Sequence, residues 1–252
     1  MVQVNATRTA DQFWAHRGIP SRFPENTLPS FQAAAEGGAK WIETDVDICH
    51  DGTLLICHDA TLDRTTNASG PCADLRREDL SQVDAGAWFG PQFKNTPLPV
   101  LSEVVDLCLE HGLNLNLELK PTPNGAQAAR HLVESAVKEL TRFDDPNRVV
   151  ISSFNPLLLA TAQEVAPQFP RGALFEHLAL ELGWKTICEM VGATAIHPEA
   201  AHLTAELVAQ FRNEGLEVRP WTVNGSAQAN QLFNWGVTAI FTDRADWFIE
   251  NL

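Results

Sequence analysis

The stretch that decides the fold is Phe13-Trp14-Ala15-His16-Arg17-Gly18, followed after a short gap by Pro24-Glu25-Asn26-Thr27. Its apolar start, residues 13–15, is long enough for a buried strand and too short for a core helix. Asn26 or Thr27 can cap the amphipathic run from Leu28 to Glu36. The pattern therefore predicts a strand and then a helix, with a histidine and an arginine on the loop between them. In parallel α/β folds, catalytic residues gather at that edge of the sheet.

The same alternation of strand and helix continues along most of the chain. Strands are predicted at residues 41–48, 54–58, 114–119, 149–153, 173–175, 194–197, 216–222 and 238–242, and helices at 101–111, 125–140, 156–165, 178–191, 204–213, 227–235 and from 246 to the end. This rhythm predicts an α/β protein with a TIM (β/α)8 barrel, as one domain over residues 1–252. A doubly wound sheet is the alternative, but no glycine-rich dinucleotide motif follows a strand.

Residues 59 to 98 interrupt the alternation. They are rich in glycine and proline, and only residues 76–83 have a helical pattern. We expect this segment to be an insertion in the barrel.

Composition limits the classes of function. The chain has 252 residues, 44% of them hydrophobic, and a formal net charge of −14. This charge argues against nucleic acid and against anionic membrane surfaces, but it leaves a small anionic substrate open. No apolar run approaches the roughly 18 residues that cross a bilayer, and the start lacks a signal-peptide pattern. The five cysteines have no framework spacing, so we expect free thiols in the cytoplasm.

A hairpin is predicted where Asp51 and Gly52 separate two strands. If these are the two turn residues, Asp45 lies opposite His58, and Glu43 shares that face because side chains alternate along a strand. The same register places Cys57 opposite Val46 on the other face. Cys49 and Cys57 are therefore not expected to form a zinc site.

The carboxylates at the predicted strand ends suggest a cation site. Glu118 and Lys120 point to the same side of their strand. A salt bridge between them at the barrel rim would explain this arrangement without any function. Buried carboxylates inside a barrel are costly unless they are paired or bind a metal. Glu43, Asp45 and Glu118, with no thiolate ligand, suit a hard cation such as Mg²⁺ or Ca²⁺.

The histidines and the fixed cations suit cleavage of a phosphate diester. Of His16 and His58, one can take a proton from the nucleophile while the other protonates the leaving oxygen. Arg17 and Lys120 can offset the charge on the non-bridging oxygens.

Taken in order along the chain, these residues resemble the glycerophosphodiester phosphodiesterase family. The matching motifs are His16-Arg17-Gly18, Pro24-Glu25-Asn26-Thr27, Ile42-Glu43-Thr44-Asp45-Val46, Asp51-Gly52 with His58-Asp59, Leu62-Asp63-Arg64-Thr65-Thr66, Glu118-Leu119-Lys120, Ser152-Ser153-Phe154, Trp221-Thr222-Val223-Asn224 and Thr242-Asp243. Each motif is weak alone, but together they cover nearly the whole chain in the family's order. The segment from Val83 to Pro99 is similar to the bacterial cytoplasmic branch.

The resemblance implies a TIM barrel with a small insertion between the second strand and its helix, one divalent metal, and hydrolysis of glycerophosphodiesters to glycerol 3-phosphate and an alcohol. By position, it makes His16 and His58 the acid/base pair and Glu43, Asp45 and Glu118 the metal ligands. It makes Arg17 and Lys120 phosphate contacts. Glu25 and Asn26 become supporting residues at the rim, and Phe154 and Trp221 line the pocket on the glycerol side.

Two other functions stay open at this point. One is a related barrel phospholipase or lysophospholipase D that acts on lipid head groups, and the other is a non-catalytic barrel that binds a phosphodiester. The sequence does not decide the alcohol, the choice between Mg²⁺ and Ca²⁺, the oligomeric state, or which histidine is the acid. It also leaves His197 open, as a polar group of the pocket or as a structural histidine at a strand end.

Overall fold

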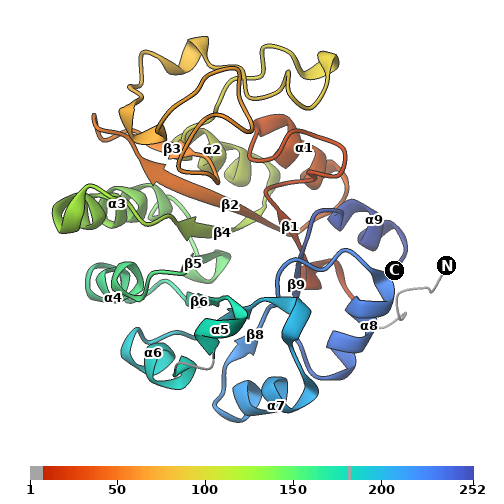
Figure 1. Ribbon diagram of the computed structural model, residues 1–252. Coiled ribbons are helices and arrows are strands. Elements are labelled where there is room, and N and C mark those ends of the chain that lie inside the picture. The colour runs from red at the N-terminus through yellow and green to blue at the C-terminus, as the bar shows by residue number, and fades with distance from the viewer. Residues whose placement is uncertain (1–7, 181–182) are drawn as a thin grey trace.

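The computed structural model, which describes residues 8–180 and 183–252, is a TIM barrel of parallel strands surrounded by helices (Figure 1). The order of neighbouring strands is β8-β7-β6-β5-β4-β2-β1-β9, and β3 pairs only with β2. Their bounds are Phe13–His16 for β1, Trp41–Ile48 for β2, Leu54–Ile56 for β3, Asn114–Leu119 for β4, Val149–Ser153 for β5, Arg171–Phe175 for β6, Ala195–Pro198 for β7, Glu217–Val218 for β8 and Ile240–Thr242 for β9. The predicted fold class is confirmed.

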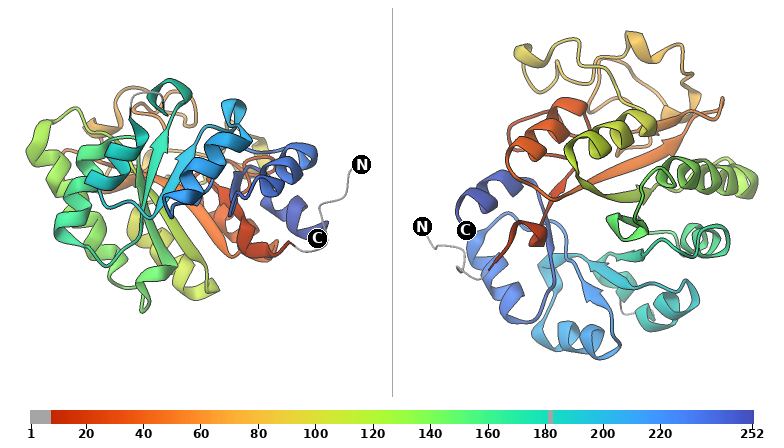
Figure 2. Two further views of the ribbon diagram at one scale, coloured as in Figure 1. Left: turned by 90° about the horizontal axis from the view of Figure 1, so that it is seen from below. Right: turned by 180° about the vertical axis from the view of Figure 1, so that it is seen from behind.

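Helices pack around the outside of the strands, as the views from below and behind show (Figure 2). They are α1 (Leu28–Glu36), α2 (Leu101–His111), α3 (Gly125–Leu140), α4 (Pro156–Val165), α5 (His177–Leu180), α6 (Trp184–Met190), α7 (Ala205–Asn213), α8 (Ser226–Asn234) and α9 (Ala245–Glu250). No helix in the described part of the chain is long and apolar enough to cross a membrane.

Two predicted elements differ most from the structure; in addition, the helical pattern over residues 76–83 forms only the 3-10 turn Leu80–Gln82, and the strand predicted over 54–58 ends at Ile56. The single helix predicted over 178–191 is divided, because Gly183 adopts a left-handed conformation with φ of 107° before α6 begins; residues 181–182 lie outside the described part. The strand predicted over 216–222 is reduced to β8. Hydrogen bonds beyond β8 still close the barrel, since the Phe241 amide donates to the carbonyl of Pro220 and the Val223 amide donates to that of Phe241.

The hairpin register differs from the prediction by one residue. Val46 pairs with Ile56, and Ile48 pairs with Leu54. The cause is a three-residue loop, residues 50–52, in which Gly52 has φ of 86°, whereas a two-residue turn was assumed. The Cys49 amide accordingly donates to the carbonyl of Thr53.

This shift changes two earlier expectations. Asp45 now faces Cys57, whose amide donates to the Asp45 carbonyl, so His58 is not its cross-strand partner. The argument against zinc was also wrong, because Cys49 and Cys57 lie with Cys72 in one apolar cluster. The candidate metal-ligand group found in the described residues consists of carboxylates only.

Residues 59–98 follow β3 and contain only short 3-10 turns, at Cys72–Asp74, Leu80–Gln82 and Pro91–Phe93. Apolar side chains of this segment pack on one side of the β2–β3 hairpin, around Leu55 and Cys57. The description of this segment as an insertion within a single domain stays a prediction.

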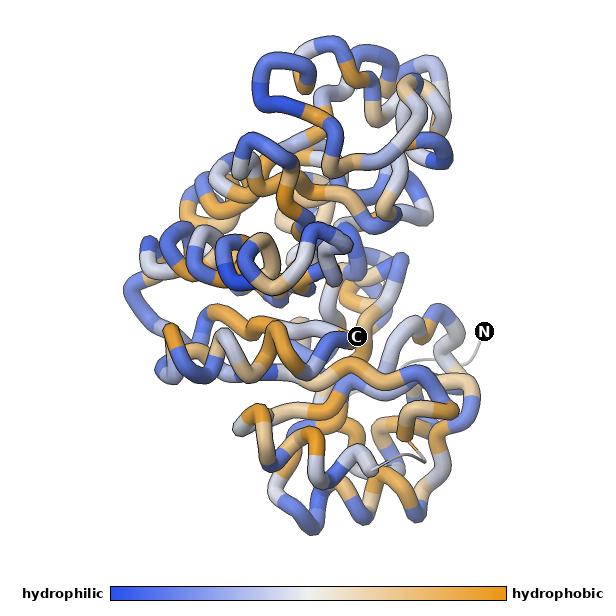
Figure 3. The backbone as a smooth tube through the Cα atoms, turned by 60° about the vertical axis from the view of Figure 1, so that its left-hand side comes forward, coloured by the Kyte–Doolittle hydropathy of each residue, from blue (hydrophilic) through white to orange (hydrophobic). Residues whose placement is uncertain are grey.

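The main core lies between the strands and the helices, and a smaller aromatic cluster fills the barrel interior. In Figure 3 hydrophobic bands recur along the strands and helices. Inside the barrel, Trp14 stacks on Trp41 with ring centroids 4.2 Å apart, and Phe241 packs edge-on to Trp14. Because this layer is closed, polar inward-facing residues nearer the strand ends form the floor of a pocket.

His197 belongs to the closed layer. It is fully buried, packs against Trp14 and Phe241, and has no hydrogen-bond partner for either ring nitrogen in the described residues. Burial, and then the Arg219 guanidinium, lower the pKa of His197 well below its usual value. The structure therefore favours a neutral, structural histidine.

We expect Gly172→Ala to destabilise the protein, because a Cβ there would lie 2.3 Å from Cε1 of His197. Overpacking of this kind costs about 1–3 kcal/mol of unfolding free energy, measurable by urea denaturation. The control is Gly225→Ala, because Gly225 is exposed and a Cβ there meets no atom within 4 Å. A Gly172→Ala protein as stable as this control would show that the His197 ring can move aside.

Candidate active site

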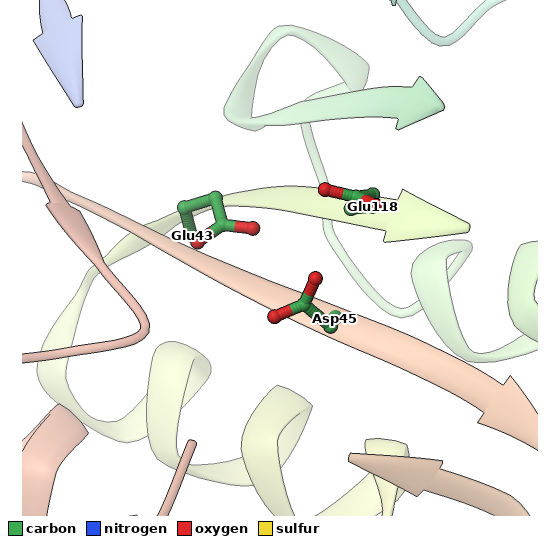
Figure 4. Close-up of side chains that lie close together, drawn as sticks. All are labelled: Glu43, Asp45 and Glu118. Carbon is green, nitrogen blue, oxygen red and sulfur yellow. The ribbon is translucent and has the colours of Figure 1, made fainter. Parts of the chain in front are cut away.

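Three carboxylates from two neighbouring strands converge between the middle of β2 and the end of β4 (Figure 4). The parallel pairing sets Asp45 directly beside Glu118, and Glu43 precedes Asp45 by two residues on the same face. One oxygen from each carboxylate lies within 4.8 Å of the others. The strand register thus produces the cluster that the sequence predicts.

Two side-chain cations compensate part of this negative charge. Nζ of Lys120 lies 2.8 Å from Oε1 of Glu118 and 3.4 Å from Oδ1 of Asp45. Nε of Arg17 lies 3.4 Å from Oδ2 of Asp45. The salt bridge considered for Glu118 and Lys120 is present, but two unit charges do not balance three carboxylates.

The remaining imbalance changes how the acids ionise. Burial, followed by repulsion from Asp45 and Glu118, raises the pKa of Glu43 well above its usual value. Burial and the Asp45 charge raise the pKa of Glu118 to about 7. Asp45 is different: burial opposes its ionisation, but Arg17 and Lys120 overcome this and lower its pKa to about 2.

His16 is oriented by a carboxylate from the last strand's end. Its Nδ1 lies 2.7 Å from Oδ1 of Asp243, and the other oxygen of this carboxylate, Oδ2, accepts a hydrogen bond from Nδ2 of Asn224. Because an ionised carboxylate only accepts hydrogen bonds, Nδ1 carries the hydrogen and donates a hydrogen bond to Asp243. Nε2 is then the free nitrogen, and it points toward Glu43 at 4.0 Å.

His58 has the same kind of support from a different part of the chain. Its Nδ1 lies 2.6 Å from Oδ1 of Asp59, and Arg64 donates to both oxygens of Asp59. Burial lowers the pKa of His58, and Arg17 and Lys120 add to this effect against the attraction of Asp45. His58 therefore lies close enough to Asp45 to interact with it and lines the same pocket as Glu43 and Glu118, although it is not the cross-strand partner of Asp45.

Glu25 and Asn26 join the two sides of the site. Glu25 accepts hydrogen bonds from Arg17 and from Arg64. Nδ2 of Asn26 donates to Oδ2 of Asp45 at 2.9 Å. Both residues contact other residues of the site and neither lines the main pocket.

The loop between β1 and α1 needs unusual backbone conformations to do this. Arg17 and Asn26 have φ of 54° and 55°, and Gly18 has φ of 87°. A Cβ on Gly18 would lie 2.3 Å from Oγ of Ser30, which accepts a hydrogen bond from the Ile19 amide. Glycine after the arginine is therefore required for both the left-handed turn and the close approach of α1.

A pocket of about 500 Å³ opens beside the carboxylates. Its lining consists of His16, Arg17, Glu43, His58, Asn116, Glu118, Lys120, Pro121, Ser152, Phe154, Leu174, Glu176, Trp221 and Phe241. Phe154 and Trp221 meet edge to face on its apolar side, with ring centroids 5.5 Å apart. Asp45 lies just behind the wall and is only 1% exposed.

Sequence reasoning missed the side chains that orient the histidines: Asp59, Arg64, Asn224 and Asp243. They lie within the quoted motifs, and Asp59 directly follows His58. It also missed Asn116, Ser152, Leu174, Glu176 and Phe241 in the pocket wall. The signal for Asn116 was available, because it precedes Glu118 by two residues on a strand and so shares its face.

The carboxylate cluster is compatible with a divalent metal. All three acids are buried and offer only oxygen ligands, and when all three are ionised their charge exceeds that of Arg17 and Lys120. Hard cations prefer such oxygen ligands.

Comparison with known proteins gives consistent matches. The sequence model of the glycerophosphoryl diester phosphodiesterase family matches residues 16–247. A glycerophosphodiester phosphodiesterase of Caldanaerobacter subterraneus is 34% identical over 93% of this chain and 95% of its own length. One from Bacillus subtilis is 32% identical over 93% of this chain and 84% of its own. A solved phosphodiesterase of Oleispira antarctica, in complex with the product sn-glycerol-3-phosphate, has a TM-score of 0.89 and 30% identity, covering 95% of this chain and 96% of its own.

The raised pKa of Glu118 predicts how the metal-free protein responds to pH. With a pKa of about 7, against an ordinary value of 4.5, folded Glu118 keeps a proton that the unfolded chain releases. Its stabilising contribution is complete below about pH 4.5 and is lost as the pH rises to about 7. In EDTA, Glu118→Gln should flatten this fall in unfolding free energy by up to about 1.4 kcal/mol per pH unit. The exposed Glu110→Gln is the control, and equal pH profiles for the two variants would contradict the assignment.

Proposed function

The chain belongs to the glycerophosphoryl diester phosphodiesterase family and is a phosphodiester hydrolase, and from this we propose a specific reaction and mechanism for its site. Water cleaves a glycerophosphodiester to glycerol 3-phosphate and an alcohol. The observation that carries this proposal is the pair of carboxylate-supported histidines on the pocket that also contains the buried acids, Arg17 and Lys120. These groups favour an enzyme over a non-catalytic binding barrel.

The two histidines share the proton transfers. His16 ends β1, His58 follows β3, and both line the pocket, so a phosphodiester between them has one imidazole near each side. One imidazole removes a proton from the attacking oxygen, and the other delivers a proton to the departing alcohol. Asp243 and Asp59 hold the rings so that the nitrogen opposite each carboxylate faces the substrate.

Arg17 and Lys120 bind the phosphoryl group. Both line the pocket and lie beside the acids, so their charges are held in place before substrate arrives. Charge-assisted hydrogen bonds from fixed donors stabilise the charge that develops on the non-bridging oxygens.

Phe154 and Trp221 bind the glycerol moiety. They form the apolar wall of the pocket, and Nε1 of Trp221 is fixed by donating to the carbonyl of His197. The glycerol 3-phosphate product in the Oleispira relative supports a glycerol site in this fold.

Glu43, Asp45 and Glu118 hold one divalent cation, Mg²⁺ or Ca²⁺. Such an ion supplies Lewis-acid stabilisation of charge on the phosphoryl oxygens. The attacking oxygen is that of water or of the substrate's neighbouring glycerol hydroxyl; in the second case water opens a cyclic phosphate afterwards.

We also propose that the protein works in the cytoplasm, which is supported by five free and buried cysteines.

Removal of the metal tests the cation. Chelation should lower kcat/KM for glycerophosphocholine by roughly 100-fold or more, because the transition state loses several kcal/mol of charge stabilisation. Mg²⁺ or Ca²⁺ should restore the rate, and a titration with each shows which ion serves. Full activity after dialysis into excess EDTA would refute the metal site.

Substitution of the histidines tests the acid/base pair. His16→Ala and His58→Ala should each cost roughly 10²- to 10⁴-fold in kcat/KM, and the double variant should lose less than the product of the two. A substrate with a p-nitrophenol leaving group needs no proton from the enzyme, so it should rescue only the variant that lacks the acid. The control is His111→Ala, on the outer helix α2. Equal rescue of both variants would show that the roles are not divided.

A further inference from the structure

A second hollow, of about 330 Å³, opens between the loops that follow β1, β8 and β9. His16 and Arg17 line both this hollow and the proposed active-site pocket, so the two spaces adjoin at these side chains. The rest of its lining consists of Pro20, Ser21, Glu25, Asn224, Asp243 and Arg244. The hollow is therefore polar and charged, unlike the apolar wall that Phe154 and Trp221 form in the main pocket.

Arg244 brings a cation without an acid partner to this hollow. Its guanidinium lies over the ring of Trp247, 4.5 Å from the ring centroid, and this contact restrains the side chain. Among the described residues, Arg244 forms no ion pair and its side chain donates no hydrogen bond. The nearby Arg22, by contrast, is paired with Asp246. In a chain with a net charge of −14, such a guanidinium is available to a carboxylate or phosphate of a ligand.

Asp243, the residue before Arg244, supplies the opposite charge. Its oxygens are bound by the ring of His16 and by the amide of Asn224. While His16 is neutral, no cation of the described residues forms an ion pair with this carboxylate, whose side chain is 31% exposed. The other acid of the hollow, Glu25, is already bound by two arginines. Two neighbouring residues thus present one unpaired charge of each sign.

The hollow lies across the barrel from the Phe154 side of the proposed glycerol site. Phe154 follows β5, whereas Asp243 and Arg244 follow β9. In the closed order of strands, β9 is opposite β5 in either direction around the barrel. A phosphodiester whose glycerol contacts Phe154 therefore directs its other ester oxygen toward the hollow, next to His16.

We propose that Arg244 is a specificity-determining residue that binds a carboxylate on the substrate's head group, with the ammonium group of the same head group at Asp243. The hollow thereby selects amino-acid head groups, such as serine, over simple amino alcohols. The inference rests on the proposed function, because the phosphodiester is cleaved at the same site and only its alcohol is specified further. The products are then glycerol 3-phosphate and the hydroxy amino acid.

The pair of charges explains why both groups of the head group matter. A head group without a carboxylate leaves the Arg244 guanidinium without a partner. A head group with a carboxylate but no ammonium group places a second negative charge beside Asp243 with nothing to offset it. A guanidinium binds a carboxylate through two parallel hydrogen bonds, which makes recognition of this group selective.

Three glycerophosphodiesters that differ only in the head group test the proposal. They are the serine ester, the ethanolamine ester, which lacks the carboxylate, and the ethylene glycol ester, in which a hydroxyl also replaces the ammonium group. We expect kcat/KM to fall in this order, by about tenfold when the carboxylate is lost, because a charge-assisted pair is lost with it. Equal values for either neighbouring pair of esters would overturn the proposal.

Arg244→Gln tests whether Arg244 makes the discrimination. The readout is the ratio of kcat/KM for the serine ester to that for the ethanolamine ester, because a general loss of folding or of phosphoryl binding lowers both values alike. We expect this ratio to fall about tenfold in Arg244→Gln and less in Arg244→Lys, which keeps the charge but not the paired donors.

The matched control is Arg76→Gln. Arg76 is exposed and lines neither the main pocket nor the second hollow, so this variant should keep the ratio of the wild-type protein. If Arg244→Gln keeps it as well, another group recognises the carboxylate and the proposal is wrong.

A variant that fills the hollow tests where the head group lies. Ser21 is exposed and lines the second hollow but not the main pocket. Ser21→Trp should lower kcat/KM for the serine ester more than for the methyl ester of glycerol 3-phosphate, whose head group is too small to fill the hollow. The control is Ser81→Trp, at an exposed position in the segment 59–98. Equal effects of Ser21→Trp on the two esters would place the head group elsewhere and overturn the inference.

The outcomes separate this inference from the function on which it rests. If none of the esters is hydrolysed, the methyl ester included, the proposed function fails and the inference fails with it. If all are hydrolysed with similar kcat/KM, the inference is wrong and the proposed function stands.

Discussion

The site depends on holding three carboxylates within a few ångströms inside the barrel. Register alone brings Asp45 beside Glu118, and this proximity is unfavourable unless opposite charge is supplied. Arg17 and Lys120 supply part of it from fixed positions. Both cations therefore have a structural role that does not depend on any substrate, because removing either would leave buried negative charge less compensated.

The fixed positions of these cations depend in turn on local backbone. Arg17 reaches Asp45 because the chain turns sharply after β1, and that turn is possible because Gly18 leaves room for Ser30 of α1. Lys120 follows Glu118 by two residues at the end of β4, and its amide donates to the carbonyl of Val46. Below them, Trp14 and Trp41 close the barrel interior, so the charged layer faces the pocket.

The sequence predicted the parts of this arrangement that follow from periodicity. The bounds of β2, β4 and α2 were predicted because strong apolar patterns end at polar or turn residues. The hairpin register was not predicted correctly, because the same sequence around Gly52 is compatible with a two-residue turn and with a three-residue turn. The partnership of His16 with Asp243 joins the two ends of the chain, and only closure of the barrel brings them together.

The segment from residue 59 to 98 lies outside the alternation of strands and helices, yet its side chains contact the candidate site. Asp59 and Arg64 belong to this segment, and they connect His58 to Glu25 on the loop after β1. Glu25 also binds Arg17, which lies beside Asp45. A hydrogen bond from His58 to Asp59 and the ion pairs that follow therefore connect this histidine to the carboxylate cluster without a break. Asp59 is bound through both oxygens by the cation Arg64, whereas Asp243 is bound by the neutral amide of Asn224. The carboxylate beside His58 is therefore more fully neutralised than the one beside His16. This difference gives a physical basis for dividing the acid and base roles between the two histidines.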